Sequence, residues 1–220
     1  MYKRQDKDKK FHCVEKMTPQ AFAHQYVGDF FNDKVKLIND PRHEYGRVLI
    51  DKRAKNATDL PDLEGINVDM DTMSLVAQKA IENGETMWFA CDVVENYDRQ
   101  SGILDQDLYR IDHQDFGKMA FDKESRINAR YSYPCHAMNL TGFNKQKDHV
   151  NFWKVENSWG DEIGKKGFFS MSDEWFRDNN FELIVDQKFL PEGLYEKAYN
   201  LDKIVYDPYD PLCLAFKKLK

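Results

Sequence analysis

Three consecutive stretches between Tyr133 and Phe169 decide the fold. They read Tyr133-Pro-Cys-His136-Ala-Met, then Phe152-Trp-Lys-Val-Glu-Asn157-Ser-Trp-Gly, then Gly164-Lys-Lys-Gly-Phe-Phe. Apolar and β-branched residues recur within short runs, and Gly or Asn-Lys turns separate these runs, which is the pattern of short strands joined by tight connections. The region therefore predicts strands that follow one another closely in the chain.

Further strand signals extend this pattern on the C-terminal side. The expected strands cover residues 137–143, 150–156, 167–171 and 181–185, and several short strands in succession suggest an antiparallel sheet or barrel. A capping signal, Ser172-Asp-Glu-Trp-Phe, predicts one short helix between the last two strands.

Helical signals dominate the first part of the chain. Thr18-Pro19 followed by spaced aromatic residues predicts a helix at about 18–31, and an apolar stripe from Asp71 closed by Asn83-Gly84 predicts another. Residues 39–67 are rich in breakers, so we expect loops there around one strand at Val48-Leu-Ile50; residues 86–94 predict a buried strand. Helices segregated from strands indicate the α+β class.

Composition excludes several kinds of protein. The 220 residues are 41% hydrophobic and 32% charged, which suits a globular chain, and a net charge of −6 argues against nucleic-acid binding. The basic runs at 3–10 and 217–220 are expected to be solvated termini. No apolar run approaches the length of a membrane helix, and no signal peptide is evident, so we expect a cytoplasmic protein without membrane anchorage.

The four cysteines are Cys13, Cys91, Cys135 and Cys213. They lie far apart, with no CxxC pair and no spacing typical of a zinc site, so we expect reduced thiols and no metal or other cofactor. Cys91, beside Trp88 and Phe89, is expected to be buried and inert.

The region around His136 and Asn157 resembles papain-like cysteine peptidases, in which a His begins one barrel strand and an Asn-Ser-Trp-Gly element ends the next. Upstream segments resemble the bleomycin hydrolase and aminopeptidase C branch. They are Thr18-Pro-Gln-Ala-Phe22, Val35-Lys-Leu-Ile-Asn39, Ile66-Asn-Val-Asp-Met70, Trp88-Phe-Ala-Cys-Asp-Val93, Asp98-Arg-Gln-Ser-Gly-Ile-Leu-Asp105 and Asp210-Pro-Leu212. The resemblance spans about residues 15–215.

This resemblance implies a site. A thiol nucleophile needs an imidazole that takes its proton and returns it, and His136 matches that general base and acid. Asn157 matches the residue that orients the ring without adding a buried charge. Trp159 matches the indole that covers the bond between them. Taken singly, each residue is more often an ordinary structural one; the combination and spacing favour the catalytic interpretation.

The nucleophile itself has no counterpart here. The family carries it in an N-terminal half, after a Gln that helps to form the oxyanion hole, and none of the four cysteines has that context. Cys135 adjoins His136, but successive side chains of a strand diverge, so we do not expect it to substitute. The chain is thus expected to be the C-terminal half, mainly the antiparallel barrel with flanking helices, and inactive alone.

The expected organisation has three parts: a basic segment at 1–17, the peptidase half at 18–205 and a tail at 206–220. In the family the C-terminus lies in the cleft and restricts the enzyme to aminopeptidase action, but here three lysines extend the tail. The resemblance implies peptide substrates, and as partners the missing N-terminal half or a homohexamer. The alternative is a degenerate, non-catalytic binding or oligomerisation module.

Overall fold

The computed structural model describes residues 2–5, 8–14, 17–53, 59–109 and 121–213. The chain divides into two compact units, residues 1–34 and 35–220. In the first unit, β1 (Tyr2–Gln5) pairs antiparallel with β2 (Phe11–Val14), although the basic N-terminus was expected to be a frayed segment.

The helix predicted at 18–31 is present but shorter. Thr18 caps it, because its hydroxyl accepts a hydrogen bond from the Ala21 amide at 3.1 Å. The helical turns comprise α1 (Pro19–Phe22) and a π-helical segment, η1 (Ala23–Val27). Gly28 then adopts a φ of 55°, a left-handed value that ends the helix at the preceding residue.

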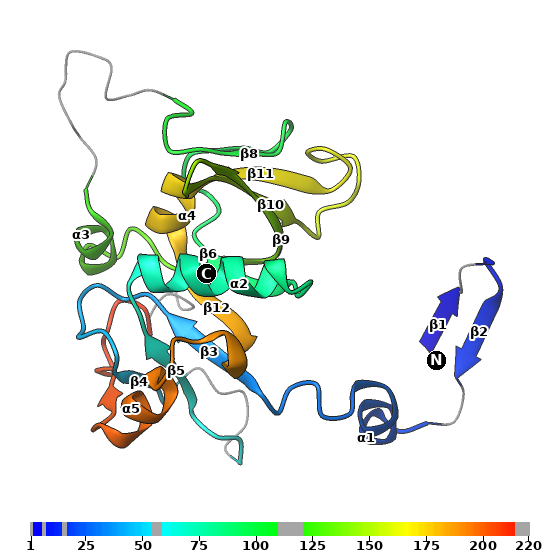
Figure 1. Cartoon of the computed structure of the whole chain (residues 1–220), viewed down its shortest axis with the longest axis horizontal. Coiled ribbons are helices and arrows are strands. Elements are labelled where there is room, and N and C mark those ends of the chain that lie inside the picture. Colours follow the sequence, from blue (N-terminus) through cyan, green and yellow to red (C-terminus); the bar gives the residue numbers. More distant parts are fainter. Residues whose placement is uncertain (1, 6–7, 15–16, 54–58, 110–120, 214–220) are drawn as a thin grey trace. The chain divides into compact units, whose positions relative to one another are not determined.

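One eleven-stranded sheet forms the frame of the second unit (Figure 1). Its strands are β3 (Lys34–Ile38), β4 (Val48–Asp51), β5 (Leu63–Asn67), β6 (Met87–Cys91), β7 (Tyr97–Asp98), β8 (Ile103–Leu104), β9 (His136–Gln146), β10 (His149–Glu156), β11 (Phe168–Ser172), β12 (Asn180–Asp186) and β13 (Ile204–Val205). Their order across the sheet is β13-β4-β5-β3-β12-β6-β9-β10-β11-β8-β7.

The sheet is mixed. The ladders from β12 through β6, β9 and β10 to β11 are antiparallel, as predicted, whereas β13 with β4, β3 with β5, and β8 with β11 pair in parallel. The four strands expected between 137 and 185 are all present. The expectation of a single strand within 39–67 was wrong, because β5 pairs with β4 and β3. The barrel geometry stays a prediction.

Helical segments complete the second unit. They are α2 (Met70–Glu82), α3 (Lys123–Asn128), α4 (Asp173–Asn179), the 3-10 turn η3 (Gln187–Phe189) and α5 (Leu194–Asn200). The predicted ends are present in both helices: α2 closes at Asn83, followed by Gly84 with a φ of 79°, and Ser172 accepts from the Trp175 amide before α4. At its other end α2 is capped by Asp69, which was not predicted from the sequence and which accepts from the Thr72 amide. The helix α2 packs on β9 and β12 through a buried stripe that includes Met73, Val76 and Ala77.

Two indoles stabilise the core where it meets α4. Trp153 and Trp175 are fully buried, and each indole N–H has a partner: Trp153 donates to Asp173 at 2.9 Å, and Trp175 donates to the Glu95 carbonyl at 2.7 Å. Burying such a side chain contributes about 1.5–3 kcal/mol or more, provided that its polar atom is satisfied. Among the described residues, no helix is long and apolar enough to cross a membrane.

Candidate active site

Adjacent antiparallel strands bring His136 and Asn157 together. His136 opens β9 and lies opposite Cys91 of β6, and the amide of the preceding residue, Cys135, donates to the Cys91 carbonyl at 3.0 Å. Asn157 directly follows β10, and its amide donates to the Gly167 carbonyl at 2.9 Å. The two residues are therefore placed by backbone hydrogen bonds to the strands beside β9 and β10, and the β9–β10 ladder between them contains two register shifts.

The His136 ring meets the Asn157 amide. Nε2 of His136 lies 2.9 Å from Oδ1 of Asn157, and Asn157 is buried. The same Oδ1 accepts the Ser158 backbone N–H at 2.7 Å, which identifies that atom of the amide as the oxygen. Because an oxygen can only accept, Nε2 carries the proton in this bond, and Nδ1 of the neutral ring is left as the basic nitrogen.

Trp159 stacks on this pair. The centroids of the His136 and Trp159 rings are 4.8 Å apart, with an interplanar angle of 30°. Tyr97 and Phe169 contact the indole edge-on, and the Arg99 guanidinium lies 5.3 Å from the ring centroid. A ring held in this way can screen the bond to Asn157 from water and restrict rotation of the imidazole.

The turn that carries Trp159 depends on glycine. Gly164 has a φ of 61°, and a Cβ there would lie 2.6 Å from the Phe168 carbonyl oxygen and 2.9 Å from the Phe169 ring. Phe169 in turn supports the indole of Trp159. Only glycine fits this close approach, so the Gly164 position is part of what holds the indole over His136.

Cys135 has other partners. Its Sγ lies 3.5 Å from Oδ1 of Asp92, whose other oxygen accepts from the Ser132 hydroxyl at 2.7 Å. Burial, with a contribution from the Asp92 charge, raises the pKa of the Cys135 thiol, although backbone hydrogen bonds oppose this. A raised pKa beside a carboxylate is the opposite of what a nucleophilic thiol requires.

Cys91 and Cys213 are also unsuited. Cys91 is fully buried, as expected, and burial raises its pKa well above the usual range. Burial, followed by the nearby Asp51 carboxylate, raises the pKa of Cys213 to about 12. Among the described residues, no group of His, Cys, Asp and Glu side chains could hold a metal ion.

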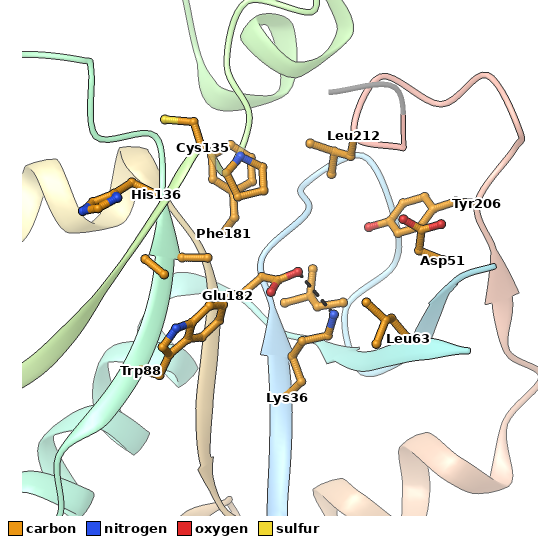
Figure 2. A pocket seen from close by; sticks show the side chains of 14 residues that line it. Lys36, Asp51, Leu63, Trp88, Cys135, His136, Phe181, Glu182, Tyr206 and Leu212 are labelled. Atoms are coloured by element: carbon orange, nitrogen blue, oxygen red, sulfur yellow. Dashed lines mark hydrogen bonds and ion pairs between the residues drawn. The ribbon is translucent and has the colours of Figure 1, made fainter. Parts of the chain in front are cut away.

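A cavity of about 320 Å³ lies beside His136 (Figure 2). Its walls are mostly apolar and include Trp88 and Phe181, whereas Lys36 and Glu182 form an ion pair of 3.2 Å within it. Tyr206 and Leu212 also line it. No local sequence pattern predicts this group of residues, because strands and loops remote in the chain supply its members.

Comparison with known proteins identifies the family of the chain. Residues 1–213 match the Peptidase C1-like family. The chain belongs to this family of papain-like peptidases, as the resemblance predicted. It is 36% identical over 210 residues to aminopeptidase C of Listeria monocytogenes, covering 94% of this chain and 47% of that protein. It is 32% identical over 217 residues to human bleomycin hydrolase, with coverages of 94% and 47%.

A solved structure supports the same fold. The crystal structure of PepW from Lactobacillus rhamnosis superposes with a TM-score of 0.87 at 33% identity, covering 96% of this chain and 48% of that one. The chain therefore spans about half the length of the curated relatives and of the solved structure that it matches.

Proposed function

We propose that this chain supplies the general base and the orienting amide of a thiol aminopeptidase, and that it corresponds to the C-terminal half of such an enzyme. The observation that carries the proposal is the 2.9 Å contact between Nε2 of His136 and Oδ1 of Asn157 beneath the Trp159 ring. The names of the relatives, aminopeptidase C among them, support peptides as the substrate class.

The geometry suits proton transfer at Nδ1 of His136. With Nε2–H bound to Asn157, Nδ1 is the atom that can take the proton of a thiol, leaving a thiolate beside an imidazolium. The thiolate attacks the scissile carbonyl, the imidazolium returns the proton to the departing amine, and water, deprotonated by the same ring, hydrolyses the acyl-enzyme. Asn157 holds the ring through all of these steps without being protonated or deprotonated.

The nucleophile in this proposal comes from a segment outside this sequence. Cys135 is directed to Asp92, and the pKa values of all three cysteines discussed above are raised. A His–Asn pair without its thiol loses most of the catalytic rate, by roughly 10⁶-fold in a comparable serine system. This chain alone is therefore expected to be inactive.

Complementation tests the proposal. The purified chain is assayed against an aminoacyl fluorogenic amide, alone and after co-expression with the N-terminal half of Listeria monocytogenes aminopeptidase C. Activity only in the combination, and its loss in His136→Ala, is the expected result. A folded, monodisperse combination that forms but shows no activity would instead favour a non-catalytic binding or oligomerisation module.

A further inference from the structure

A buried carboxylate faces the segment that leads into His136. Asp92 directly follows β6, and it is 1% exposed. Its backbone amide donates to the carbonyl of Asn179 at 2.9 Å, and Asn179 is itself fully buried at the end of α4. The backbone of Asp92 is therefore fixed to the second unit, and both oxygens of its side chain are left to make other contacts.

Both oxygens bind the segment formed by residues 132–135. The Ser132 hydroxyl donates to Oδ2 of Asp92 at 2.7 Å, and the Cys135 thiol donates to Oδ1 at 3.5 Å. The two donors stand on either side of Tyr133-Pro134, so the carboxylate ties the two ends of the segment together. Ser132 is buried, which keeps its bond to Asp92 away from water.

The segment has no strand ladder to hold it. It precedes β9 and is not part of any strand among the described residues, and its proline has no backbone N–H to donate. Its backbone is bound near both ends, where the Ser132 amide donates to the Arg126 carbonyl at 3.3 Å and the Cys135 amide donates to the Cys91 carbonyl at 3.0 Å. His136 is the next residue, so the direction of its side chain depends on the path of this segment.

The carboxylate and its two donors depend on one another. Among the residues that the structure describes, no ion pair involves Asp92, and a second acid lies nearby: burial, and then the Asp92 charge, raise the pKa of Glu95. A buried charge without a cation is costly unless hydrogen bonds compensate it. Burial is the main cause that raises the pKa of the Cys135 thiol, so the sulfur keeps its proton and remains a donor. The bonds from Ser132 and Cys135 therefore stabilise the carboxylate, and the carboxylate holds the two donors in place.

We propose that Asp92 is a positioning residue. By accepting hydrogen bonds from Ser132 and Cys135, its carboxylate fixes the segment that leads into His136 and so holds the imidazole against Asn157. The geometric part of this proposal stands on these contacts alone, whereas the consequence for peptide hydrolysis rests on the proposed function. Each part has its own measurement.

Hydrogen exchange in the chain by itself tests the geometric part. NMR follows two protons: that of the Cys135 amide, which is bonded to the Cys91 carbonyl, and that of Nε2 of His136, which is bonded to Asn157. In Asp92→Ala both protons should exchange about 10-fold faster, because the segment loses two hydrogen bonds to a charged group. Wild-type exchange rates in a folded Asp92→Ala protein would overturn the positioning role.

A global reporter and a matched control separate this effect from a general loss of stability. The Val68 amide donates to a carbonyl of β3 at 2.8 Å, and both exchange rates are compared with that of this amide. Asp173→Ala is the control, because the two oxygens of Asp173 also accept from two side chains, those of Trp153 and Arg177. This control should leave the Cys135 and His136 protons at their wild-type rates relative to Val68.

Two smaller changes decide the point if Asp92→Ala fails to fold. Ser132→Ala and Cys135→Ala each remove one donor, and each should speed exchange of the Nε2 proton of His136 about 2- to 10-fold. Cys135→Ser retains a donor and should match the wild type. Unchanged exchange in folded Ser132→Ala and Cys135→Ala, or equal acceleration in Cys135→Ser and Cys135→Ala, would overturn the proposal.

Catalysis in the complemented enzyme tests the consequence for hydrolysis. Ser132→Ala should lower kcat about 10-fold with KM changed less than about 2-fold, because a misplaced base affects the steps that follow binding. Cys135→Ser should keep the wild-type kcat. Faster exchange at His136 with an unchanged kcat in Ser132→Ala would overturn the catalytic consequence. If the wild-type combination is inactive, the proposed function fails, and the exchange rates still decide whether Asp92 positions His136.

Discussion

His136 and Asn157 come from neighbouring strands, and the imidazole Nε2 of the first lies 2.9 Å from the amide oxygen of the second. The Ser158 amide binds the same oxygen at 2.7 Å, so the acceptor is fixed independently of the histidine. This arrangement assigns the proton to Nε2 and leaves Nδ1 as the basic atom.

Replacement of Asn157 should reduce turnover. In the complemented enzyme, Asn157→Ala removes the acceptor that orients the ring, and a misplacement of about 1 Å costs on the order of 10²-fold. We expect kcat to fall about 10- to 100-fold, with a smaller change in KM. Asn139→Ala is the matched control, because the side-chain amide of Asn139 donates its hydrogen bond to the Glu156 carboxylate. Equal losses in the two variants would refute an orienting role for Asn157.

The Trp159 ring should protect the histidine N–H. An aromatic pair contributes about 0.5–1.5 kcal/mol, so in Trp159→Leu the His136 ring N–H should exchange with solvent about 2- to 10-fold faster, as measured by NMR. Trp159→Phe retains a stacking ring and should lie close to the wild type. An exchange rate that does not respond to Trp159→Leu would argue that the indole does not screen the bond.

Close approach at Gly164 should make substitution costly there. Gly164 and Gly46 both have positive φ values, but a Cβ at Gly46 would meet nothing within 4 Å, whereas at Gly164 it would lie 2.6 Å from the Phe168 carbonyl oxygen. Gly46→Ala should cost about 1–2 kcal/mol of unfolding free energy through backbone conformation alone. Gly164→Ala should cost about 1–3 kcal/mol more, because of the added clash. Urea unfolding measures both, and equal losses would contradict the account.

A buried lysine should make stability depend on pH. Lys123 donates to Oδ1 of Asn39 at 2.6 Å and to the Asn180 carbonyl, and its Nζ lies 4.6 Å from the Phe181 ring centroid. Burial, followed by the Arg126 charge, lowers the pKa of Lys123 to about 7. The neutral amine is therefore favoured in the folded protein, and the charged form is destabilised.

The direction of the effect follows from proton binding. An unfolded lysine keeps its proton up to about pH 10.4, so between about pH 7 and pH 10 the unfolded state binds more protons, and stability rises with pH. Below pH 7 the folded state also binds the proton, and the full cost of burying the charged amine lowers the unfolding free energy. From pH 7 to pH 9 the unfolding free energy of the wild type should increase by about 1–3 kcal/mol relative to Lys123→Met. Exposed Lys165→Met is the control; identical pH profiles in all three proteins would exclude the effect.

Local patterns predicted the strands that hold the site. Apolar runs and turn residues identified β9 and β10, whereas the relation of His136 to Asn157 was implied by the family resemblance. The Ser172 cap also identified α4. In each case the deciding interactions lie within a few residues, or between strands adjacent in the chain.

Elements that depend on remote partners were missed. The strand β5 contains Gly65, a poor strand former that the fold requires because a Cβ there would lie 2.8 Å from both the Ile38 side chain and the Lys36 carbonyl oxygen. The parallel pairing of β13 with β4, and the Arg42 link to Asp210, join residues more than 150 positions apart. Nothing in the local pattern of either segment specifies its partner.

Reactivity of a thiol supplied in trans tests the central claim most directly. The N-terminal half of Listeria monocytogenes aminopeptidase C, co-expressed with this chain, is alkylated at pH 6, where an unassisted thiol with a pKa of about 8.5 is scarcely ionised. If His136 pairs with that thiol, the nucleophile should be alkylated at least about 10-fold faster with the wild-type chain than with His136→Ala. Equal rates in two complexes that assemble equally well would contradict the assignment of His136 as the base.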